Sequence, residues 1–267
     1  MANSTAYRFS HISMSLLMDD MRFNKGKPAA GDKIPEINMV STTGEQITWQ
    51  TFSGKPVFLT VGSMTCPMTT ASIPVLKRLY RAFGNDVEFL MVNVREAHPA
   101  ENIHQPSTFE DKLKHAVELK HEHLIPWTVV SDSIEGDFHQ QLDTKPNSAY
   151  IIDEEGFIVF RSLFSNDEDN LYDALEAAAT GAPTPQIESQ AMVKPLTKAM
   201  GYLPYVLKQA GEQAKTEMWR VAPPMMIWGQ ATSLFGSQTI ENRGVSAALL
   251  IVSVLAILAA GLYWLFS

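Results

Sequence analysis

The sequence has little of what several common protein classes require. Its 267 residues include a single cysteine, Cys66, which excludes an internal disulfide framework and a zinc site built from several thiolates. Neither of the two familiar glycine-rich phosphate-binding patterns, G-x-G-x-x-G and G-x-x-x-x-G-K, occurs. Basic residues are outnumbered, with 21 Lys and Arg against 29 Asp and Glu, which argues against a nucleic-acid binder because phosphate recognition needs a basic face.

Charge is absent altogether after Arg243. The 22 residues 245–266 contain no charged or amide side chain, and a helix rising about 1.5 Å per residue over that length spans the hydrocarbon core of a bilayer. Tyr263 and Trp264 stand where interfacial aromatic residues are expected. A buried core helix is the alternative, but such helices rarely run so far without a polar face. The segment is therefore interpreted as a transmembrane helix.

The other end of the chain carries no comparable segment. Residues 1–20 lack the basic start and the long apolar core of a secretory signal. We therefore expect a single-pass C-terminal anchor with the catalytic domain in the cytoplasm, where a lone thiol stays reduced. Arg243, just before the span, agrees with the positive-inside bias. Residues 1–30 are expected to form a flexible lead.

Residues 31–181 alternate between strand and helix patterns. Compact apolar runs predict three buried strands, apolar residues at helical spacing predict two helices, and turn residues predict two hairpins before a final helix. The predicted order is a hairpin over 37–49, strands at 57–61, 87–94 and 128–131 separated by helices at 68–83 and 108–122, a hairpin over 150–161 and a helix at 170–179. This order is typical of an α/β domain with a mixed sheet.

Residues 182–244 differ in composition from the domain before them. Several prolines separate short amphipathic stretches rich in Met, Lys and aromatic residues. Part of this linker, residues 224–236, is suited to lie along a membrane surface, and packing of an ordinary linker on the domain is an equal alternative.

The only cysteine occupies a position suited to chemistry. Cys66 follows a predicted buried strand directly and precedes a predicted helix. Unpaired N–H groups and the helix dipole at such a position favour a thiolate and lower the pKa of a thiol from about 8.5. Ser63 and Thr65 supply hydroxyl groups toward the sulfur. An inert buried cysteine is the alternative, since that is the commoner fate of a lone cysteine.

Several segments resemble known families. Gly-Asp-x-Ile-Pro at 31–35, the strand–cysteine–helix unit and residues 145–153 resemble thioredoxin-fold redoxins. Within them the chain is most similar to iodothyronine deiodinases, which carry Gly-Ser-x-Thr-selenocysteine-Pro and Glu-Ala-His-Pro segments; these are matched here at residues 62–67 and 96–99. The resemblance covers roughly residues 31–180. It implies a thioredoxin-like fold with an N-terminal hairpin and a cis-proline, Pro146, facing Cys66.

The sequence departs from that family at three places. Cysteine replaces selenocysteine at Cys66, so the resemblance implies a weaker nucleophile. The family's second histidine falls on Pro106, and His104 is the nearest candidate for it. The family's substrate-binding arginine falls on Phe164, with Arg161 nearby. Pro146, His104 and Arg161 are thus candidate substrate-binding residues.

The candidate catalytic residues are expected to meet at one edge of the sheet. Adjacent parallel strands would bring Cys66 together with Glu96 and His98, where α/β proteins bind ligands. His98 would exchange protons near neutral pH, with Glu96 orienting it or holding it charged. A thiolate that attacks iodine on an aromatic ring expels a carbon that must be protonated, and one that attacks peroxide expels hydroxide. Either reaction oxidises the sulfur, so an external thiol reductant is expected, and no bound cofactor.

Three functions follow from this pattern. The first is reductive dehalogenation of an iodinated phenolic substrate. The second is a one-cysteine peroxiredoxin-type peroxidase; Ser63 fits its pattern, whereas Leu59 stands where peroxiredoxins carry proline. The third is a non-catalytic redoxin-fold module that docks a partner at the membrane.

Four possible metal ligands lie close together in the sequence, but their spacing fits no zinc motif. They are expected to form a solvated helix end instead: His115, His121, Glu122 and His123. The oligomeric state is left open, a homodimer included.

Overall fold

The sheet is built around two central strands, Val57–Gly62 and Glu88–Asn93, which carry buried side chains on both faces. The computed structural model describes residues 7–52 and 54–266. Its eight strands form one mixed sheet in the order β2-β1-β5-β4-β3-β6-β7-β8. Their bounds are β1 Asn38–Ser41, β2 Gln46–Thr48, β3 Val57–Gly62, β4 Glu88–Asn93, β5 Thr128–Ser131, β6 Ala149–Ile152, β7 Ile158–Ser162 and β8 Glu188–Ser189. The predicted mixed α/β class is confirmed.

The relative direction of neighbouring strands follows from whether a helix or a hairpin connects them. β3, β4 and β5 are parallel to one another, because a helix crosses over between each pair. β6 lies antiparallel to β3 and forms a hairpin with β7. β3 is buried along its whole length, as a central strand covered on both faces must be. The carboxyl ends of β3 and β4 therefore meet at one edge of the sheet.

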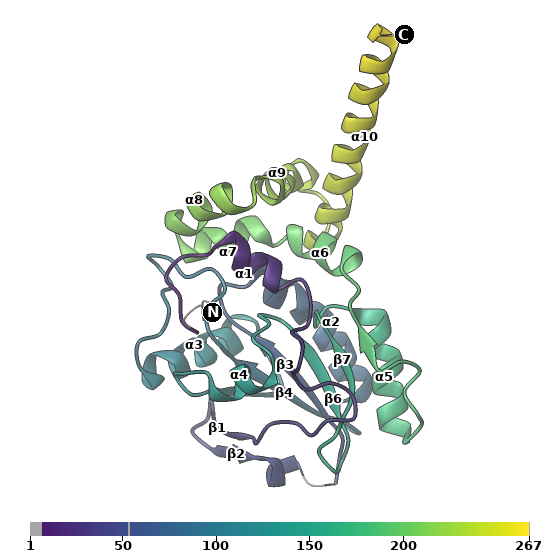
Figure 1. The fold of residues 1–267 in the computed structure, drawn as a ribbon. Coiled ribbons are helices and arrows are strands. Elements are labelled where there is room, and N and C mark those ends of the chain that lie inside the picture. The colour runs from purple at the N-terminus through teal and green to yellow at the C-terminus, as the bar shows by residue number, and fades with distance from the viewer. Residues whose placement is uncertain (1–6, 53, 267) are drawn as a thin grey trace.

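One face of the sheet is covered by three long helices. They are α2 (Pro67–Phe83), α3 (Phe109–Glu122) and α5 (Glu168–Thr180), behind the sheet in Figure 1. Side chains from the strands, among them Phe58, Phe89 and Met91, pack with the apolar stripes of these helices in one buried cluster. Thr108 is the N-cap residue of α3, and its hydroxyl accepts the N–H of Asp111.

The opposite face is covered by the start of the chain. Residues 7–37 run across it with the short helix α1 (Met14–Asp19), and α4 (Asp137–Leu142) lies beside them (Figure 1). Phe23 is buried in the same cluster as Tyr150, and the Tyr7 hydroxyl bonds His139 Nδ1 at 3.0 Å. Residues 7–30 thus pack on the sheet, unlike the flexible lead expected over residues 1–30, of which residues 1–6 lie outside the described residues. The apolar side chains on this face of the sheet need a cover, and this segment provides it.

Residues 193–235 form a helical layer above the sheet. Its helices are α6 (Val193–Met200), α7 (Leu203–Ala210), α8 (Glu212–Val221), α9 (Pro223–Ala231) and the 3-10 turn η2 (Thr232–Phe235). Gly211 separates α7 from α8 with φ at +133°, a conformation that other residues rarely adopt. The layer has its own buried cluster, which includes Leu207 and Met218. Within residues 224–236, for which two alternatives were predicted, Met226 is buried in this cluster whereas Ile227 and Leu234 are exposed, so both alternatives stay open.

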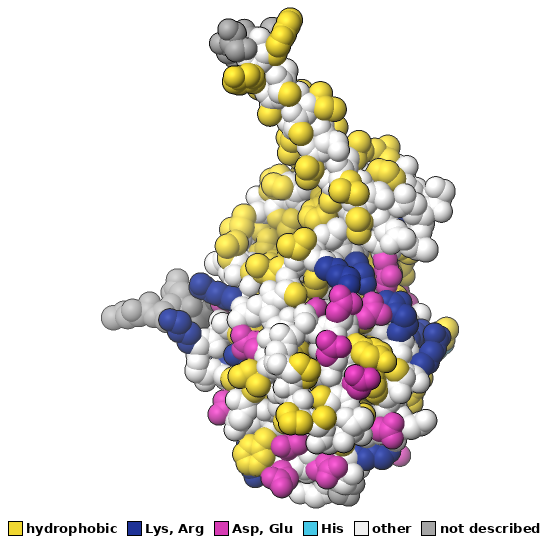
Figure 2. Space-filling model, turned by 90° about the vertical axis from the view of Figure 1, so that its right-hand side faces the viewer, with side chains coloured by type: hydrophobic (Ala, Val, Ile, Leu, Met, Phe, Trp, Pro, Cys, Tyr) yellow, Lys and Arg dark blue, Asp and Glu magenta, His cyan; other side chains and the backbone are white. Residues whose placement is uncertain are grey.

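One apolar helix leaves the body of the molecule. α10 (Ile240–Phe266) starts against α6 and α9 and then extends away from them (Figure 1). Within the described residues, Ile240–Trp264 is a helix long and apolar enough to cross a membrane, with a mean hydropathy of 2.6 and 6% of its most apolar stretch buried. Figure 2 shows hydrophobic side chains continuing from α10 onto the helices below it, while charged side chains gather on the domain.

Candidate active site

Cys66 lies where β3 passes into α2. It is the N-cap residue of α2, followed by Pro67 at the first helical position, where proline loses no hydrogen bond. Its N–H donates to the Ser63 carbonyl at 3.4 Å, which closes a tight turn. Gly62 allows the close approach of strand and helix, because a Cβ there would lie 2.8 Å from Thr69 Cγ2. The Ser63 N–H donates in turn to Thr69 Oγ1 at 3.3 Å.

Glu96 connects the Cys66 turn to the segment after β4. Its Oε2 accepts the N–H of Thr65 at 2.8 Å and the Thr65 hydroxyl at 2.7 Å. The Thr65 Oγ1 then accepts the backbone N–H of His98 at 3.0 Å. Glu96 is fully buried, so these charge-assisted bonds are not weakened by water. The expected bond from Glu96 to the His98 ring is absent among these contacts; Glu96 positions the two backbone segments instead.

His115 is a site residue that sequence analysis assigned to a solvated helix end. Its Nδ1 lies 2.9 Å from Glu96 Oε1, and its side chain is 14% exposed. Burial lowers the pKa of His115, but the hydrogen bond and charge of Glu96 outweigh this, so the pKa is raised overall. A signal was present in the sequence: His115 adjoins Ala116 and lies three residues from Lys112, both on the buried face of α3.

His98 lies beside Cys66 with an unused ring nitrogen. It is 8% exposed, and its Nδ1 is buried with no hydrogen-bond partner among the described residues. Burial lowers the pKa of His98 to about 4, against the opposing charges of Glu217 and Glu96. The ring is therefore neutral at pH 7. This differs from the expected proton exchange near neutral pH and leaves His98 as a hydrogen-bonding group.

The Cys66 thiol is held protonated in this closed structure. Cys66 is 2% exposed, and burial raises the pKa of its thiol to about 11. The Thr69 hydroxyl and the N–H groups of Thr69 and Met68 act in the opposite direction, without forming a capping bond to the sulfur. The expected lowering of the thiol pKa is thus wrong here, because desolvation outweighs the helix N-terminus. Sequence analysis also missed Thr69.

Cys66 and His98 both line one small cavity. It holds about 50 Å³ and is bounded by α1, the Cys66 turn, the His98 segment and the helical layer. Its mostly apolar lining consists of Ile12, Leu17, Asp20, Met21, Cys66, Pro67, Met68, Ala97, His98, Pro146, Phe164, Leu196, Met200, Leu203, Met218 and Met225. Two segments that sequence analysis set apart from the domain, the lead and the linker, therefore close the candidate site.

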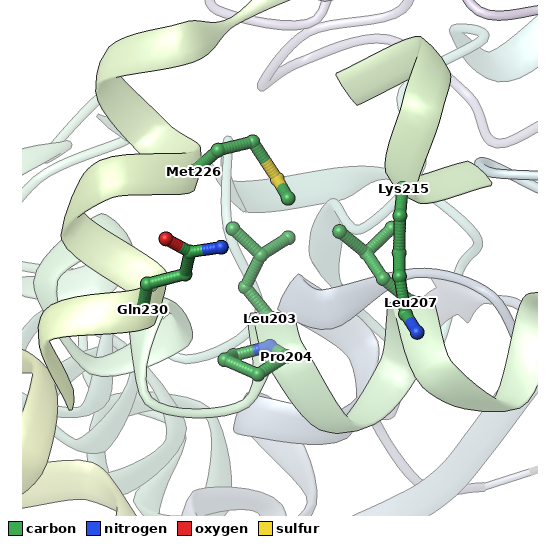
Figure 3. Close-up of a pocket in the computed structure, with 7 residues that line it drawn as sticks. Leu203, Pro204, Leu207, Lys215, Met226 and Gln230 are labelled. Carbon is green, nitrogen blue, oxygen red and sulfur yellow. The ribbon is translucent and has the colours of Figure 1, made fainter. Parts of the chain in front are cut away.

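A second pocket lies within the helical layer itself. Figure 3 shows side chains from α7, α8 and α9 converging around it, with Leu203 and Met226 facing one another and Lys215 at its side. It holds about 220 Å³ and is largely apolar. Leu203 lines both this pocket and the Cys66 cavity. The side chain of Leu203 thus lies between the two spaces.

The three candidate substrate-binding residues have different surroundings. Pro146 lines the Cys66 cavity, but the cis peptide bond expected before it is wrong, because no cis peptide bond occurs in the described residues. The Lys145 carbonyl, which precedes Pro146, lies 2.8 Å from His139 Nε2. His104 is exposed and lines a separate surface hollow. Arg161 is held by Glu188 at 2.6 Å and stacks on the Phe23 ring at 4.1 Å. His104 and Arg161 are therefore not among the residues that line the Cys66 cavity.

The raised pKa of the thiol predicts a steep pH dependence of alkylation. Only the thiolate reacts, so the rate of Cys66 alkylation by iodoacetamide is expected to rise about tenfold per pH unit from pH 7 to 10. The measurement is mass-spectrometric counting of the modified chain over time, with a thiol of pKa near 8.5 in a short peptide as control. A plateau already reached by pH 8 would contradict the burial described above.

Comparison with known proteins agrees with this architecture. The family model for iodothyronine deiodinase matches residues 5–169, more than half of the chain. No curated protein matches the chain. An uncharacterized conserved protein from Geobacillus kaustophilus is similar in structure, with a TM-score of 0.51 and 16% identity over 63% of this chain and 90% of that one.

Two further solved structures are similar to the chain. A hypothetical protein from Sinorhizobium meliloti has a TM-score of 0.50 and 12% identity, covering 62% of this chain and 93% of that one. The thioredoxin domain of a thiol-disulfide oxidoreductase from Bacteroides vulgatus has a TM-score of 0.44 and 22% identity, covering 55% and 96%. The sheet order and the family match confirm the predicted thioredoxin-like fold, and the family match supports a thiol redox function.

Proposed function

Because the chain belongs to the iodothyronine deiodinase family, we propose that it removes iodine reductively from iodinated phenolic compounds through Cys66. The observation that carries this proposal is the shared cavity of Cys66 and His98, tied together by Glu96 through Thr65. An inert core cysteine needs neither a buried carboxylate bonded to its turn nor a neighbouring histidine with a buried, unpartnered ring nitrogen among the described residues.

The reaction balances with one cysteine and two external thiols. Cys66 sulfur forms a bond to iodine while the carbon–iodine bond breaks, and the thiol proton ends on the ring carbon. An external thiol then displaces iodide from sulfur and forms a mixed disulfide with Cys66. A second external thiol releases Cys66 as the free thiol and leaves as the oxidised disulfide. The net change is one aryl iodide and two thiols converted to arene, iodide, a proton and a disulfide.

The surrounding residues have distinct parts in this proposal. The neutral His98 ring accepts or donates a hydrogen bond to the phenolic hydroxyl group. Glu96 acts through Thr65 and keeps the Cys66 turn at a fixed distance from His98. Ser63 Oγ is buried without a partner among the described residues, and it is available to a substrate or to the sulfur.

Substrate has to displace part of the cover. An engineered cavity of about 150 Å³ is large enough for benzene, whereas the Cys66 cavity holds about 50 Å³. The α1 segment and the helical layer form the cover, and the layer is continuous with α10. We propose that α10 anchors the chain in a membrane with the domain on the cytoplasmic side. An apolar substrate dissolved in that membrane then meets the cover first.

The small cavity also favours a second candidate function. About 50 Å³ accommodates hydrogen peroxide without displacing any helix. In that reaction Cys66 sulfur attacks one peroxide oxygen, hydroxide leaves and takes up a proton, and external thiols reduce the resulting sulfenic acid. This is the peroxidase alternative of the sequence analysis, and the same Cys66 carries it.

Parallel assays separate these functions. Wild-type protein is incubated with dithiothreitol and either an iodinated phenol or hydrogen peroxide, and iodide release and peroxide consumption are measured. We expect iodide release with a kcat/KM at least tenfold lower in His98→Ala, because the phenol loses its hydrogen bond. The matched control is His104→Ala, which changes an exposed histidine outside the cavity and should stay within about twofold.

The outcomes assign the function directly. Peroxide consumption without iodide release would replace dehalogenation by the peroxidase candidate. Absence of both activities would leave the non-catalytic partner-binding module.

A further inference from the structure

The lead segment brings a carboxyl group into the Cys66 cavity. Asp20 is the C-cap residue of α1 and is half-buried. It is the only carboxylic acid among the residues that line the cavity, which also contains Cys66 and His98. Nothing in residues 1–30 suggested a catalytic group in sequence analysis. The fold of this segment across the sheet is what brings Asp20 to the lining of the Cys66 cavity.

The neighbouring acids are already engaged, whereas Asp20 is not. Asp19 Oδ2 lies 3.2 Å from Lys145 Nζ, and Asp143 accepts the Asn24 side chain at 2.8 Å and lies 3.7 Å from the same lysine. Among the described residues no side-chain hydrogen bond ends on the Asp20 carboxyl group. A carboxyl group of a cavity-lining residue that has no side-chain partner is free to exchange a proton with what the cavity holds.

The proposed reaction needs such a group. The thiol begins protonated, and its proton has to reach the ring carbon as the carbon–iodine bond breaks. His98 is a poor carrier, because its ring stays neutral far below pH 7. We propose that Asp20 is the acid–base partner of Cys66: its carboxylate takes the thiol proton as the sulfur–iodine bond forms and delivers it to the carbon that leaves. This inference rests on the proposed function, and Asp20 ends the cycle unchanged.

The electrostatic surroundings of Asp20 suit that task. Burial raises the pKa of Asp20 to about 7; Arg95 and Lys145 lower it, while Asp19 and Asp143 raise it. A group that titrates near the working pH is the most effective acid–base catalyst. Across the cavity, the charge of Asp20 also contributes to the raised pKa of Cys66. Ionisation of Asp20 therefore disfavours the thiolate form of Cys66.

Proton sharing between Asp20 and Cys66 predicts how kcat/KM depends on pH. The active form carries one proton between Asp20 and Cys66, so activity requires a pH above the pKa of Asp20 and below that of the thiol. For wild type, kcat/KM for the iodinated phenol is expected to rise tenfold per pH unit below pH 7 and to level off above it. In Asp20→Asn this plateau disappears, and the value keeps rising to pH 9 because the thiol must now ionise unaided.

The loss of activity expected in Asp20→Asn, and its controls, follow from the proton transfer between Asp20 and Cys66. At pH 7, kcat/KM of Asp20→Asn should fall roughly 100-fold, the lower end of the range for a lost acid–base group. Asp20→Glu should restore an inflection near neutral pH. Asp19→Asn, one residue away and bonded to Lys145, should keep the wild-type profile. If wild type is active and Asp20→Asn keeps the inflection at pH 7, Asp20 is not the proton carrier.

A second readout does not depend on dehalogenation. An ionised Asp20 facing the sulfur disfavours the thiolate, so Asp20→Asn should speed iodoacetamide alkylation of Cys66 at pH 9 by about threefold or more. An unchanged alkylation rate would overturn the inference. Absence of iodide release by wild type with this acceleration present would instead refute the proposed function and leave the Asp20–Cys66 coupling established.

Discussion

Cys66→Ala is expected to reduce iodide release by at least about 1000-fold, to the rate of the reductant alone. The sulfur supplies the electrons that replace iodine by hydrogen, and the chain contains no other thiol to substitute for it. Alanine is preferred to serine because a serine hydroxyl at this buried position would lack a defined partner. The measurement is iodide released from an iodinated phenol in the presence of dithiothreitol.

The control for this variant is its folding. Cys66 is a small side chain in an apolar cluster, so its replacement by alanine should cost only about 1 kcal/mol of unfolding free energy. Thermal unfolding followed by circular dichroism checks this. A folded Cys66→Ala protein that retains half of the wild-type rate would place the chemistry on another residue.

Glu96→Gln is the second variant with a large expected effect. The amide keeps the shape of the carboxylate but removes the charge that faces Thr65 and His115 from within the core. Loss of these charge-assisted bonds should destabilise the protein by about 3 kcal/mol and lower kcat/KM by about 100-fold, because the Cys66 turn is no longer held. Denaturant unfolding and iodide release measure the two effects.

The pH dependence of this variant has a definite sign. The folded-state pKa of His115 is raised above its ordinary value of about 6.5. The ion pair of His115 and Glu96 therefore stabilises the folded protein fully below about pH 6.5. This stabilisation falls as pH rises through the folded-state pKa of His115. Glu96→Gln should lose more stability relative to wild type at pH 6 than at pH 9. Glu118→Gln, on the exposed side of α3, is the matched control and should change stability by less than about 0.5 kcal/mol. An equal loss of stability in both variants would contradict the assigned role of Glu96.

Most strands and helices of residues 31–181 could be predicted because their patterns are local; the short helix α4 was missed. β3 and β4 are continuous apolar runs, and α2 carries its apolar residues at helical spacing. The same patterns placed Cys66 and His98 correctly at neighbouring strand ends, where the structure has both residues lining one cavity.

The cover of the site could not be predicted from local patterns. Leu17 and Asp20 precede the domain, and Leu203 and Met218 follow it, yet all four line the Cys66 cavity. Their positions depend on contacts between segments far apart in the chain, which leave no short-range signal. The error in the thiol pKa has the same origin, since a helix N-terminus is visible in a sequence, whereas the desolvation that opposes it depends on that cover.

A single-turnover experiment tests the central claim that Cys66 is the redox centre. Wild-type protein reduced beforehand and freed of reductant is mixed with excess iodinated phenol, and iodide is measured together with the mass of Cys66. Without a thiol, water hydrolyses the sulfur–iodine bond of Cys66 to a sulfenic acid, iodide and a proton. One iodide per chain, with oxidation confined to Cys66 and turnover resumed on adding dithiothreitol, is the predicted result. Continued iodide release without a thiol, or one iodide per chain with Cys66 still reduced, would contradict it.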